Sequence, residues 1–401
     1  MKRILLLSPF FFPEQISTGR YNTWLARTLL QKGADIYVIA SHPLYPDWKP
    51  HYAHEEMEGI KVYRGGDRLH YPTNNILRRL LLELWFAWHV FRGILRLRWQ
   101  REMPDIAVAI FPPNLFYLSC SMLLPEDVRE VGIVHDLQGI YAKKKKGLLG
   151  KLLAGLIHFV EKKAFSRCDR LVFLSREMME EAMREYGLEE EACYVIYPPV
   201  TLEASRRPNS LEAIFPEGYR HVVYSGALGE KQNPERLLEL FHRASLTGDN
   251  VMFHCFSSGL FFDALRKKYL SLEAHIKFHS LVDEECLSEL YSRSDVQIIP
   301  QLPGSSKGSL PSKLPNLLAA GVPVLAITEP SSELGALINK SGGIVVHEWT
   351  PGAFTSGLMR ALDISNKFTH EDLRKRNEET ILPDFSIDKL ADIVGVSCDN
   401  R

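Results

Sequence analysis

Short apolar runs alternate with amphipathic stretches through the first half of the chain. Lys2–Ser8 is an apolar run of strand length, Thr18–Lys32 places apolar residues at helical spacing, and Ala34–Ser41 is apolar again. This order predicts a strand, a helix and a second strand. Similar strands are predicted at Ile106–Phe111, Glu130–His135 and Arg170–Ser175. Because a loop or helix follows each strand, we expect a parallel sheet.

A second α/β series follows a break in this pattern. Tyr197–Arg220 is rich in proline, serine and charged residues, which is typical of a linker. The strands predicted after it are His221–Ser225, Val251–Phe256, His275–His279, Val296–Pro300, Val324–Ile327 and Gly343–His347. The helices predicted between them are Pro234–Ala244, Glu284–Ser292 and a helix that begins at Ser312.

The expected fold class is therefore α/β, with two doubly wound Rossmann-like domains that face a central cleft. We assign residues 1–197 to the N-terminal domain and residues 198–384 to the C-terminal domain. A last helix at about 385–401 is expected to pack back on the N-terminal domain. Ligands of such domains lie at the carboxyl ends of the strands.

Composition sets few limits on function. The chain has 401 residues and a formal net charge of −1, so no overall charge attracts nucleic acid. Its six cysteines show neither CxxC pairs nor the spacing of zinc ligands, which favours reduced thiols in a cytoplasm. The apolar N-terminus lacks the cleavage site of a signal peptide, because Pro13 and Glu14 stand in its place.

One loop-to-helix segment, Pro300–Val324, carries the clearest chemical signal. A polar loop runs into Ser312 and Lys313, and an apolar helix follows as far as Gly321. A helix that began at Ser312 would direct backbone N–H groups, a hydroxyl and an ammonium at one point. Such an arrangement holds a diphosphate, so the segment predicts a nucleotide-type ligand.

The same domain opens with a second phosphate-type loop. Gly226 and Gly229 follow a predicted strand, and Lys231 precedes the next helix. The glycines would let the backbone approach a ligand, and the lysine would reach a phosphate oxygen. By itself the loop is more often an ordinary turn. Together with Lys313, Lys231 predicts a two-lysine diphosphate clamp.

Three segments resemble family-4 GT-B glycosyltransferases. They are YSGALGEKQNPE at Tyr224–Glu235, LPSKLPNLLAAGVPVLAITEPSSELG at Leu310–Gly335, and HPLYPDW at His42–Trp48. Within that family the chain is most similar to the branch of colanic-acid fucosyltransferases and other exopolysaccharide or O-antigen enzymes. The resemblance implies a GT-B fold, a nucleotide-sugar donor held mainly by the C-terminal domain, and retention of the anomeric configuration.

The chain departs from the family pattern at two glutamates. Family members carry an E-x7-E pair, and the corresponding positions here are Gly308 and Asn316. The arginine that usually precedes the clamp lysine is also absent. An asparagine is familiar at the second position in the LPSKL branch, so we interpret the change as a trait of the branch. By the same alignment, Asn316 belongs to the donor site.

The resemblance implies further site residues. His135 would contact the donor sugar, Gly19 would lie near the diphosphate, and Glu333 would lie near the nucleotide. The acceptor side would comprise Glu14, Tyr45, Asp47, Trp48 and Asp136. Each has a plainer interpretation: a histidine at a strand end, a strand-to-helix turn, a helix-capping carboxylate, or aromatic packing between loops. No Asp-x-Asp motif is placed for a metal, so we expect none and no cofactor.

Two basic stretches with aromatic residues predict contact with a membrane. Leu77–Arg101 combines aromatic residues with six arginines, and Lys143–Lys163 sets four lysines before an apolar run. Neither is long and apolar enough to span a bilayer, but basic amphipathic helices lie in the headgroup plane of anionic membranes. The alternative is that both are core helices with solvated basic faces.

The sequence thus predicts a cytoplasmic, metal-independent, retaining glycosyltransferase on the inner face of the cell membrane. It would transfer a hexose or deoxyhexose from a GDP- or UDP-linked donor to a saccharide on a polyprenyl diphosphate. Lys231, Lys313 and His135 would be its catalytic residues. One alternative is a GT-B-shaped sugar-nucleotide 2-epimerase, which isomerises the donor without an acceptor. The other is a non-catalytic module that binds a nucleotide sugar.

Overall fold

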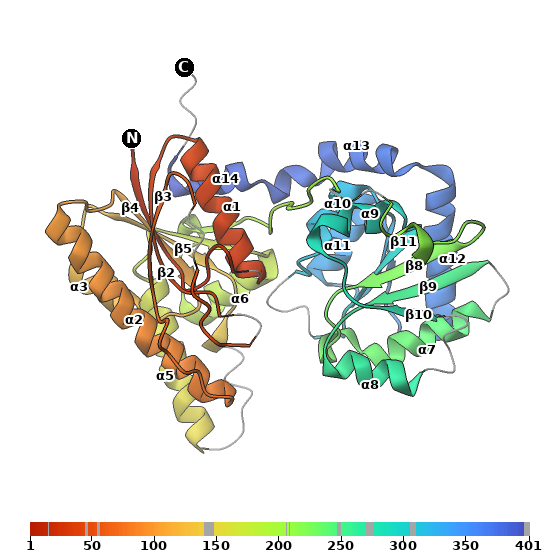
Figure 1. The fold of residues 1–401 in the computed structure, drawn as a ribbon, viewed down its shortest axis with the longest axis horizontal. Helices are drawn as coiled ribbons and strands as arrows, with labels where there is room; N and C mark the ends of the chain where they lie inside the picture. Colours follow the sequence, from red (N-terminus) through yellow and green to blue (C-terminus); the bar gives the residue numbers. More distant parts are fainter. Residues whose placement is uncertain are drawn as a thin grey trace. The chain divides into compact units, whose positions relative to one another are not determined.

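The structure is a computed structural model that describes most of the chain. It describes all residues except 15, 45–46, 54–56, 140–147, 206, 208, 247–249, 270–275, 305–309 and 397–401, and only the backbone of 148–153, 260 and 261. The chain divides into two compact units. The first contains residues 1–198 together with 386–401, and the second contains residues 199–385. Each unit has its own parallel sheet (Figure 1).

The sheet of the first unit has seven parallel strands in the order β3-β2-β1-β4-β5-β6-β7. The strands are β1 (Arg3–Leu7), β2 (Asp35–Ser41), β3 (Ile60–Gly65), β4 (Ile106–Phe111), β5 (Arg129–Val134), β6 (Arg170–Phe173) and β7 (Cys193–Val195). The helices are α1 (Ser17–Gln31), α2 (Asn75–Gln100), α3 (Tyr117–Leu123), α5 (Leu148–Phe165), α6 (Arg176–Tyr186) and α14 (Ile387–Val394). The strand order reverses between β1 and β4, which makes this point the topological switch point.

Successive side chains of each strand point to opposite faces of the sheet, so the first unit has two hydrophobic cores. Ile4 and Leu6 of β1 face a core that α1 and α14 cover, whereas Leu5 and Leu7 face the opposite core under α2, α3 and α6. Figure 1 shows α1 and α14 together on one face of this sheet and α2 on the other. The two faces explain why the strands read as continuous apolar runs in the sequence.

The second unit is a six-stranded parallel sheet in the order β10-β9-β8-β11-β12-β13. Its strands are β8 (Arg220–Ser225), β9 (Val251–Phe256), β10 (Ile276–His279), β11 (Val296–Pro300), β12 (Val324–Ile327) and β13 (Ile344–Val346). Its helices are α7 (Pro234–Ser245), α8 (Leu260–Lys268), α9 (Leu287–Ser292), α10 (Leu314–Ala320), α11 (Glu333–Ser341), α12 (Pro351–Lys367) and α13 (His370–Thr380). Here the switch point lies between β8 and β11.

The predicted α/β architecture is confirmed, with differences at edges and ends. The edge strands β3 and β7 were not predicted, because nearly all of their side chains are only partly buried and no apolar run marks them. The helix predicted from Ser312 begins at Leu314. The helix predicted at Glu284–Ser292 divides into a 3-10 turn (Glu284–Cys286) followed by α9.

The helices of the described residues were compared with the length and hydropathy that a membrane span requires. None of them meets both requirements.

Candidate functional site

The two predicted clamp lysines belong to one edge of the second sheet. Lys231 lies in the loop that follows β8, and Lys313 immediately precedes α10, which follows β11. The N–H of Leu302, just beyond β11, donates to the carbonyl of Lys231 at 2.8 Å. This bond joins the two loops at the switch point, where doubly wound domains bind ligands.

Of the two glycines in the β8 loop, only Gly226 needs to be glycine. Its φ of 139° lies in a region that other residues rarely adopt, whereas Gly229 has extended backbone with φ −137°. The N–H of Gly226 donates to the carbonyl of Phe256 at the end of β9. The loop then passes into a 3-10 turn (Glu230–Gln232), where the side chain of Lys231 is exposed.

Lys313 turns its ammonium inward under the ends of the central strands. Its Nζ donates to the carbonyls of Ser225 at 3.1 Å and Ile298 at 2.8 Å, and it lies 4.4 Å from the centre of the Tyr224 ring. Burial lowers the pKa of Lys313 to about 7. An ammonium carries three hydrogens, so the two carbonyls leave it one further hydrogen.

The rest of the predicted helix-terminus site differs from the expectation. Ser312 is exposed and lies outside the helix, α10 has only seven residues, and its Pro315 has no N–H. The prediction of helix N–H groups converging with the Ser312 hydroxyl is therefore wrong. Both ends of the Asn316 amide bond to Thr201, with Thr201 N–H donating to Oδ1 at 2.8 Å. Gly308 lies outside the described residues.

Polar side chains that sequence reasoning missed lie at the ends of β11 and β12. The Thr328 hydroxyl donates to Oγ of Ser332 at 2.9 Å and lies 3.3 Å from Oε1 of buried Gln301. Ser332 caps α11, and Glu333 is the first residue of that helix. A polar residue directly after each apolar strand was the available signal for Gln301 and Thr328.

His135 and Tyr21 form a pair of unsatisfied groups in the first unit. His135 follows β5, and its ring meets the edge of the Tyr21 ring from α1 at 4.9 Å between centroids. His135 Nε2 and Tyr21 Oη are both buried, and neither has a hydrogen-bond partner among the described residues. Burial lowers the pKa of His135 to about 4, so its imidazole is neutral at pH 7. Tyr21 was not predicted as a site residue.

A buried carboxylate holds the loop that carries His135 and Asp136. Glu161 of α5 accepts the N–H groups of Gln138 at 2.8 Å and Gly139 at 2.7 Å. It also accepts the hydroxyl of Tyr186 at 2.5 Å. Burial raises the pKa of Glu161 to about 7, and the hydrogen bonds limit that rise. Asp136 is half-buried, and its carboxylate accepts the N–H of Leu137.

Glu14 and Gly19 hold the loop after β1 together. The Glu14 carboxylate is buried and accepts the N–H of Leu44 at 2.7 Å. A Cβ on Gly19 would lie 2.8 Å from the carbonyl oxygen of Glu14, so the loop and α1 approach closely only because this residue is glycine. Glu14 thus joins the loops that follow β1 and β2, and Gly19 lets α1 approach the first of these loops.

The predicted acceptor-side residues Tyr45, Asp47 and Trp48 differ in what the structure shows of them. Trp48 meets the rings of Phe10 and Tyr71 edge-on, and the Arg78 guanidinium lies 4.4 Å from its ring centre. The indole is thus packed between loops and α2, as its plainer interpretation held. Asp47 is exposed. Tyr45 lies outside the described residues.

A metal site was sought among the same residues. No three His, Cys, Asp or Glu side chains of the described part of the chain gather closely enough to hold a metal ion.

Comparison with protein families gives each unit a domain type. Residues 18–204 match the model described as Glycosyltransferase Family 4, and residues 207–380 match Glycosyl transferases group 1. The chain is therefore a glycosyltransferase. This glycosyltransferase has a family 4 N-terminal domain followed by a group 1 domain, which confirms the resemblance read from its motifs.

Known proteins similar to this glycosyltransferase cover nearly its full length. It is 27% identical over 406 residues to the "Putative colanic acid biosynthesis glycosyl transferase WcaI" of Escherichia coli K12, covering 94% of this chain and 97% of the relative. Among solved structures, WaaG, "a glycosyltransferase involved in lipopolysaccharide biosynthesis", is 17% identical with a TM-score of 0.68 over 98% of this chain and 99% of WaaG. Sucrose-phosphate synthase from Thermosynechococcus elongatus is 15% identical with a TM-score of 0.71 over 98% of each chain. These likenesses confirm the GT-B fold class.

Proposed function

We propose that this glycosyltransferase moves a hexose or deoxyhexose from a GDP- or UDP-linked donor to a saccharide carried on a polyprenyl diphosphate. The reaction retains the anomeric configuration and needs no metal. The product belongs to a cell-surface polysaccharide, a proposal supported by the name of the colanic acid relative. The enzyme works at the inner face of the cell membrane.

The meeting of the β8 and β11 loops at the switch point carries the proposal. The bond between Leu302 and Lys231 and the bonds of Lys313 to β8 and β11 gather two cations at one sheet edge. A diphosphate that leaves the sugar carbon develops negative charge, and preorganised cations stabilise it. In the bound state the Lys313 ammonium turns its remaining hydrogen toward a phosphate oxygen.

The chemical step needs few further groups from the protein. The bond between the sugar carbon and the diphosphate oxygen breaks, and the acceptor oxygen forms the new bond on the same face. The departing diphosphate takes the proton of the acceptor hydroxyl. Neutral His135 hydrogen-bonds a hydroxyl of the transferring sugar through Nε2, and this role is supported by the buried, unpartnered state of that atom.

A lipid-linked acceptor is supported by the surface of α2. Its exposed apolar side chains recur at spacings of three, four or seven residues and therefore form one stripe along the helix. The stripe comprises Leu77, Leu80, Leu84, Trp88, Leu95 and Trp99. Leu118 and Met122 of α3, and Leu156 and Phe159 of α5, are exposed on neighbouring helices.

Part of the predicted aromatic set belongs instead to the core, since Phe86 is fully buried. Of the second basic stretch, residues 143–147 lie outside the described residues.

Donor binding by lysine variants tests the proposal. Lys231→Met should weaken binding of the correct nucleoside diphosphate by about 10- to 100-fold, because it removes a hydrogen bond to a charged group. The first measurement is a thermal-shift screen of the wild type against GDP, UDP, ADP and their common sugars, since a ligand of the folded state raises apparent stability.

The matched control is Lys367→Met, which removes an exposed lysine on α12 that pairs with Asp363. It should leave donor binding unchanged. Transfer is then measured with the donor that binds and with membrane extract as the acceptor source. Isomerisation of the donor without any acceptor, or binding with no turnover across the donor panel, would contradict a transferase.

A further inference from the structure

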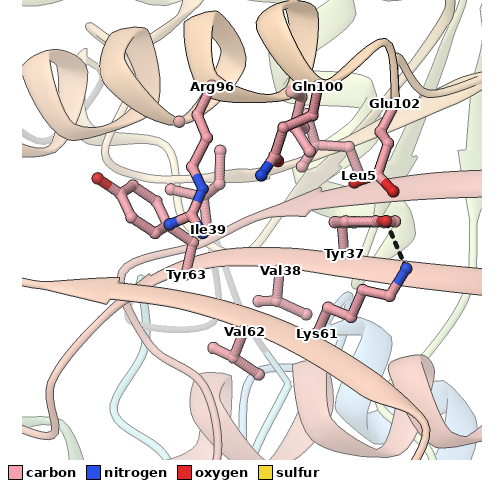
Figure 2. Close-up of a pocket in the computed structure, with 12 residues that line it drawn as sticks. Leu5, Tyr37, Val38, Ile39, Lys61, Val62, Tyr63, Arg96, Gln100 and Glu102 are labelled. Carbon is pink, nitrogen blue, oxygen red and sulfur yellow. Dashed lines mark hydrogen bonds between the residues drawn. The ribbon is translucent and has the colours of Figure 1, made fainter.

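A pocket of about 330 Å³ opens between α2 and the strands β1, β2 and β3 of the first unit (Figure 2). Tyr37 and Lys61 lie near the starts of β2 and β3, and Arg96 and Gln100 lie near the end of α2. The pocket is therefore at the amino ends of the strands. His135 and the loops after β1 lie at the opposite, carboxyl ends, so the pocket is separate from the site described above.

The sequence of α2 creates this space. At Gly93 the helix touches the sheet, because a Cβ there would lie only 2.4 Å from Cδ1 of Ile39. One turn farther on, Leu97 is buried, but Arg96 and Gln100 are polar and do not fill the layer above the strands. Figure 2 shows both side chains reaching from α2 toward the strands, with Tyr37 on the other side.

The two cations on the pocket wall, Lys61 and Arg96, differ in their partners. Lys61 donates to the hydroxyl of Tyr37 and lies 3.7 Å from the carboxylate of Asp35. Burial raises the pKa of the Tyr37 hydroxyl, the Lys61 ammonium lowers it, and the nearby Glu102 carboxylate raises it. Arg96 has no carboxylate partner among the described residues, and its guanidinium lies 5.2 Å from the ring centre of Tyr63.

The walls are unsuited to a stacked sugar ring. The Lys61 ammonium covers the Tyr37 ring at 4.3 Å. The Tyr63 ring lies between Arg96 and the stacked ring of His89, whose centroid is 4.8 Å away. Neither tyrosine therefore offers an open aromatic face. What the pocket offers instead is a planar guanidinium fork, an exposed amide at Gln100 and a carboxylate at Glu102.

The surroundings of the pocket match a lipid surface. Trp99 is 87% exposed and Leu95 is 41% exposed on the last turns of α2. Arg92, Arg98 and Arg101 are exposed there as well, and no carboxylate of the described residues pairs with them. Exposed tryptophan beside arginine is characteristic of helices that lie at the headgroup level of anionic membranes.

We propose that the pocket binds the glycerol-phosphate headgroup of an anionic phospholipid of the phosphatidylglycerol type. The guanidinium of Arg96 takes the phosphodiester through two parallel hydrogen bonds. Gln100 and Glu102 bond the glycerol hydroxyls. The single negative charge of the phosphodiester faces the positive charge of Arg96, which has no carboxylate partner among the described residues. This inference rests on the membrane association contained in the proposed function.

Vesicle binding tests the pocket. Wild-type protein is titrated with phosphatidylcholine vesicles that contain phosphatidylglycerol, or phosphatidylserine at the same mole fraction and the same net charge. We expect about tenfold tighter binding to the phosphatidylglycerol vesicles, because Glu102 accepts from the glycerol hydroxyls but repels the serine carboxylate. Arg96→Gln should abolish this preference, because without the guanidinium fork the phosphodiester is not held where Gln100 and Glu102 meet the rest of the headgroup.

The matched control is Arg98→Gln, which removes the same charge from the same helix but does not line the pocket. It should weaken binding to both vesicles by about fivefold and keep the preference, as loss of one surface charge predicts. A second variant, Gln100→Trp, fills the mouth from an exposed position without opening the core. It should also abolish the preference, and circular dichroism verifies that each variant is folded.

Three outcomes would overturn the inference. One is equal binding of the wild type to both vesicles, and another is an equal loss of preference in Arg96→Gln and Arg98→Gln. The third is saturable binding of soluble glycerol phosphate without vesicles, abolished by Arg96→Gln, while vesicle binding shows no headgroup preference. If the wild type binds neither vesicle, the proposed membrane association fails too. The thermal shift caused by the nucleotide donor does not depend on vesicle binding. Failure of the transferase assignment would therefore be detected in that separate measurement.

Discussion

Two buried polar atoms without partners mark the first unit at the scale of single residues. His135 Nε2, just after β5, and Tyr21 Oη, on α1, belong to rings that contact each other edge to face. A buried polar group without a partner costs about 1–3 kcal/mol. Other buried polar atoms of the first unit also lack partners, but these two are carried by rings in contact, and a ligand as proposed above would supply bonds to both.

Replacing Tyr21 by phenylalanine should change the stability and the activity of the protein in opposite directions. Tyr21→Phe removes an unsatisfied hydroxyl, so we expect the free energy of unfolding of the ligand-free protein to rise by about 1 kcal/mol. Turnover should fall by about tenfold, since one hydrogen bond to the substrate is lost. The measurements are denaturant unfolding and steady-state kinetics.

Tyr186→Phe is the control for this prediction. The hydroxyl of Tyr186 donates to Glu161, so its removal should lower the stability of the same unit by about 1–3 kcal/mol. If Tyr21→Phe lowers stability as Tyr186→Phe does, the Tyr21 hydroxyl already has a partner in the free protein and the ligand assignment fails.

The pH dependence of donor binding should show whether the protonated Lys313 side chain binds the phosphate. Its folded pKa of about 7 lies below the unfolded value of about 10.5, so the unfolded chain binds more protons between these values. The stability of the free protein should therefore rise as pH increases above 7. Donor affinity should fall over the same range, by at most about tenfold per pH unit, because only the ammonium binds phosphate.

Calorimetric titration of the nucleoside diphosphate between about pH 6.5 and 9 measures this trend. Subtracting the profile of Lys313→Met removes the contribution of other groups. An affinity independent of pH in the wild type would mean that Lys313 keeps its two carbonyl partners and does not reach the phosphate.

The sequence predicted which residue types form the candidate site better than it predicted how their side chains are oriented. Lys231 and Lys313 were located at one sheet edge by their positions after two strands, which the fold confirms. The direction of the Lys313 ammonium was not predictable, because it depends on carbonyls of β8 and β11 brought together only by folding. The bonds between Asn316 and Thr201 are equally nonlocal, since 115 residues separate the two.

At the scale of elements, α5 holds in place the loop that connects it to β5. Glu161 takes two backbone N–H groups from the loop after β5, and Gly139 lies directly against the carboxylate. A Cβ on Gly139 would lie 2.6 Å from Oε2 of Glu161 and 2.8 Å from Oη of Tyr186. The loop therefore has this path only with glycine at position 139.

Gly139→Ala should displace the loop that carries His135. We expect a loss of about 1–3 kcal/mol in stability from the forced shift. The turnover number should fall at least tenfold, because a displacement of about 1 Å in a catalytic group has large kinetic effects. Steady-state kinetics with varied donor separates the turnover number from the Michaelis constant.

Gly155→Ala in α5 is the matched control, because nothing lies within 4 Å of a Cβ at that position. It should leave kinetics unchanged and stabilise the helix by up to about 1 kcal/mol. Equal kinetic effects of the two alanine substitutions would show that the Glu161 contact does not position the loop.

Strands that are buried on both faces of a sheet were predictable from the sequence, whereas partly exposed edge strands were less so. Central strands such as β1 and β4 are covered on both faces and read as apolar runs. The edge strand β3 has polar or half-exposed residues at most positions, so its sequence resembles a loop. The start of α10 was misplaced because Pro311 and Pro315 permit more than one first turn.

At the scale of the whole molecule, the first unit is not continuous in sequence. Leu390, Ala391 and Val394 of α14 are fully buried in its core, beside residues of α1 and β1. Lys32 bonds to Asp388 at 3.1 Å, and Lys2 donates to the carbonyl of Gly395 at 2.5 Å. The second unit, residues 199–385, is thus an insertion between two parts of the first.

Deleting residues 386–401 should destabilise the first unit selectively. The loss of the buried side chains of α14 should cost about 5 kcal/mol or more, by analogy with large-to-small changes in cores. Thermal unfolding should show a lowered transition for the first unit and an unchanged one for the second. The donor-induced shift should persist in the second transition.

Leu390→Ala is the milder companion variant, with an expected loss of about 2–5 kcal/mol. A single transition that shifts as a whole in both variants would show that the two units unfold together. A deletion variant as stable as the wild type would show that α14 contributes nothing to the core of the first unit.

The late position of α14 has a consequence for biosynthesis. A ribosome releases the chain from its N-terminus, so the strands and helices from β1 to β7 emerge long before α14, which closes their core. The second unit is complete at residue 385 and can fold as soon as it emerges. The unit that begins the polypeptide is thus the last to reach its native state. Until then, the apolar face of α1 is exposed to chaperones.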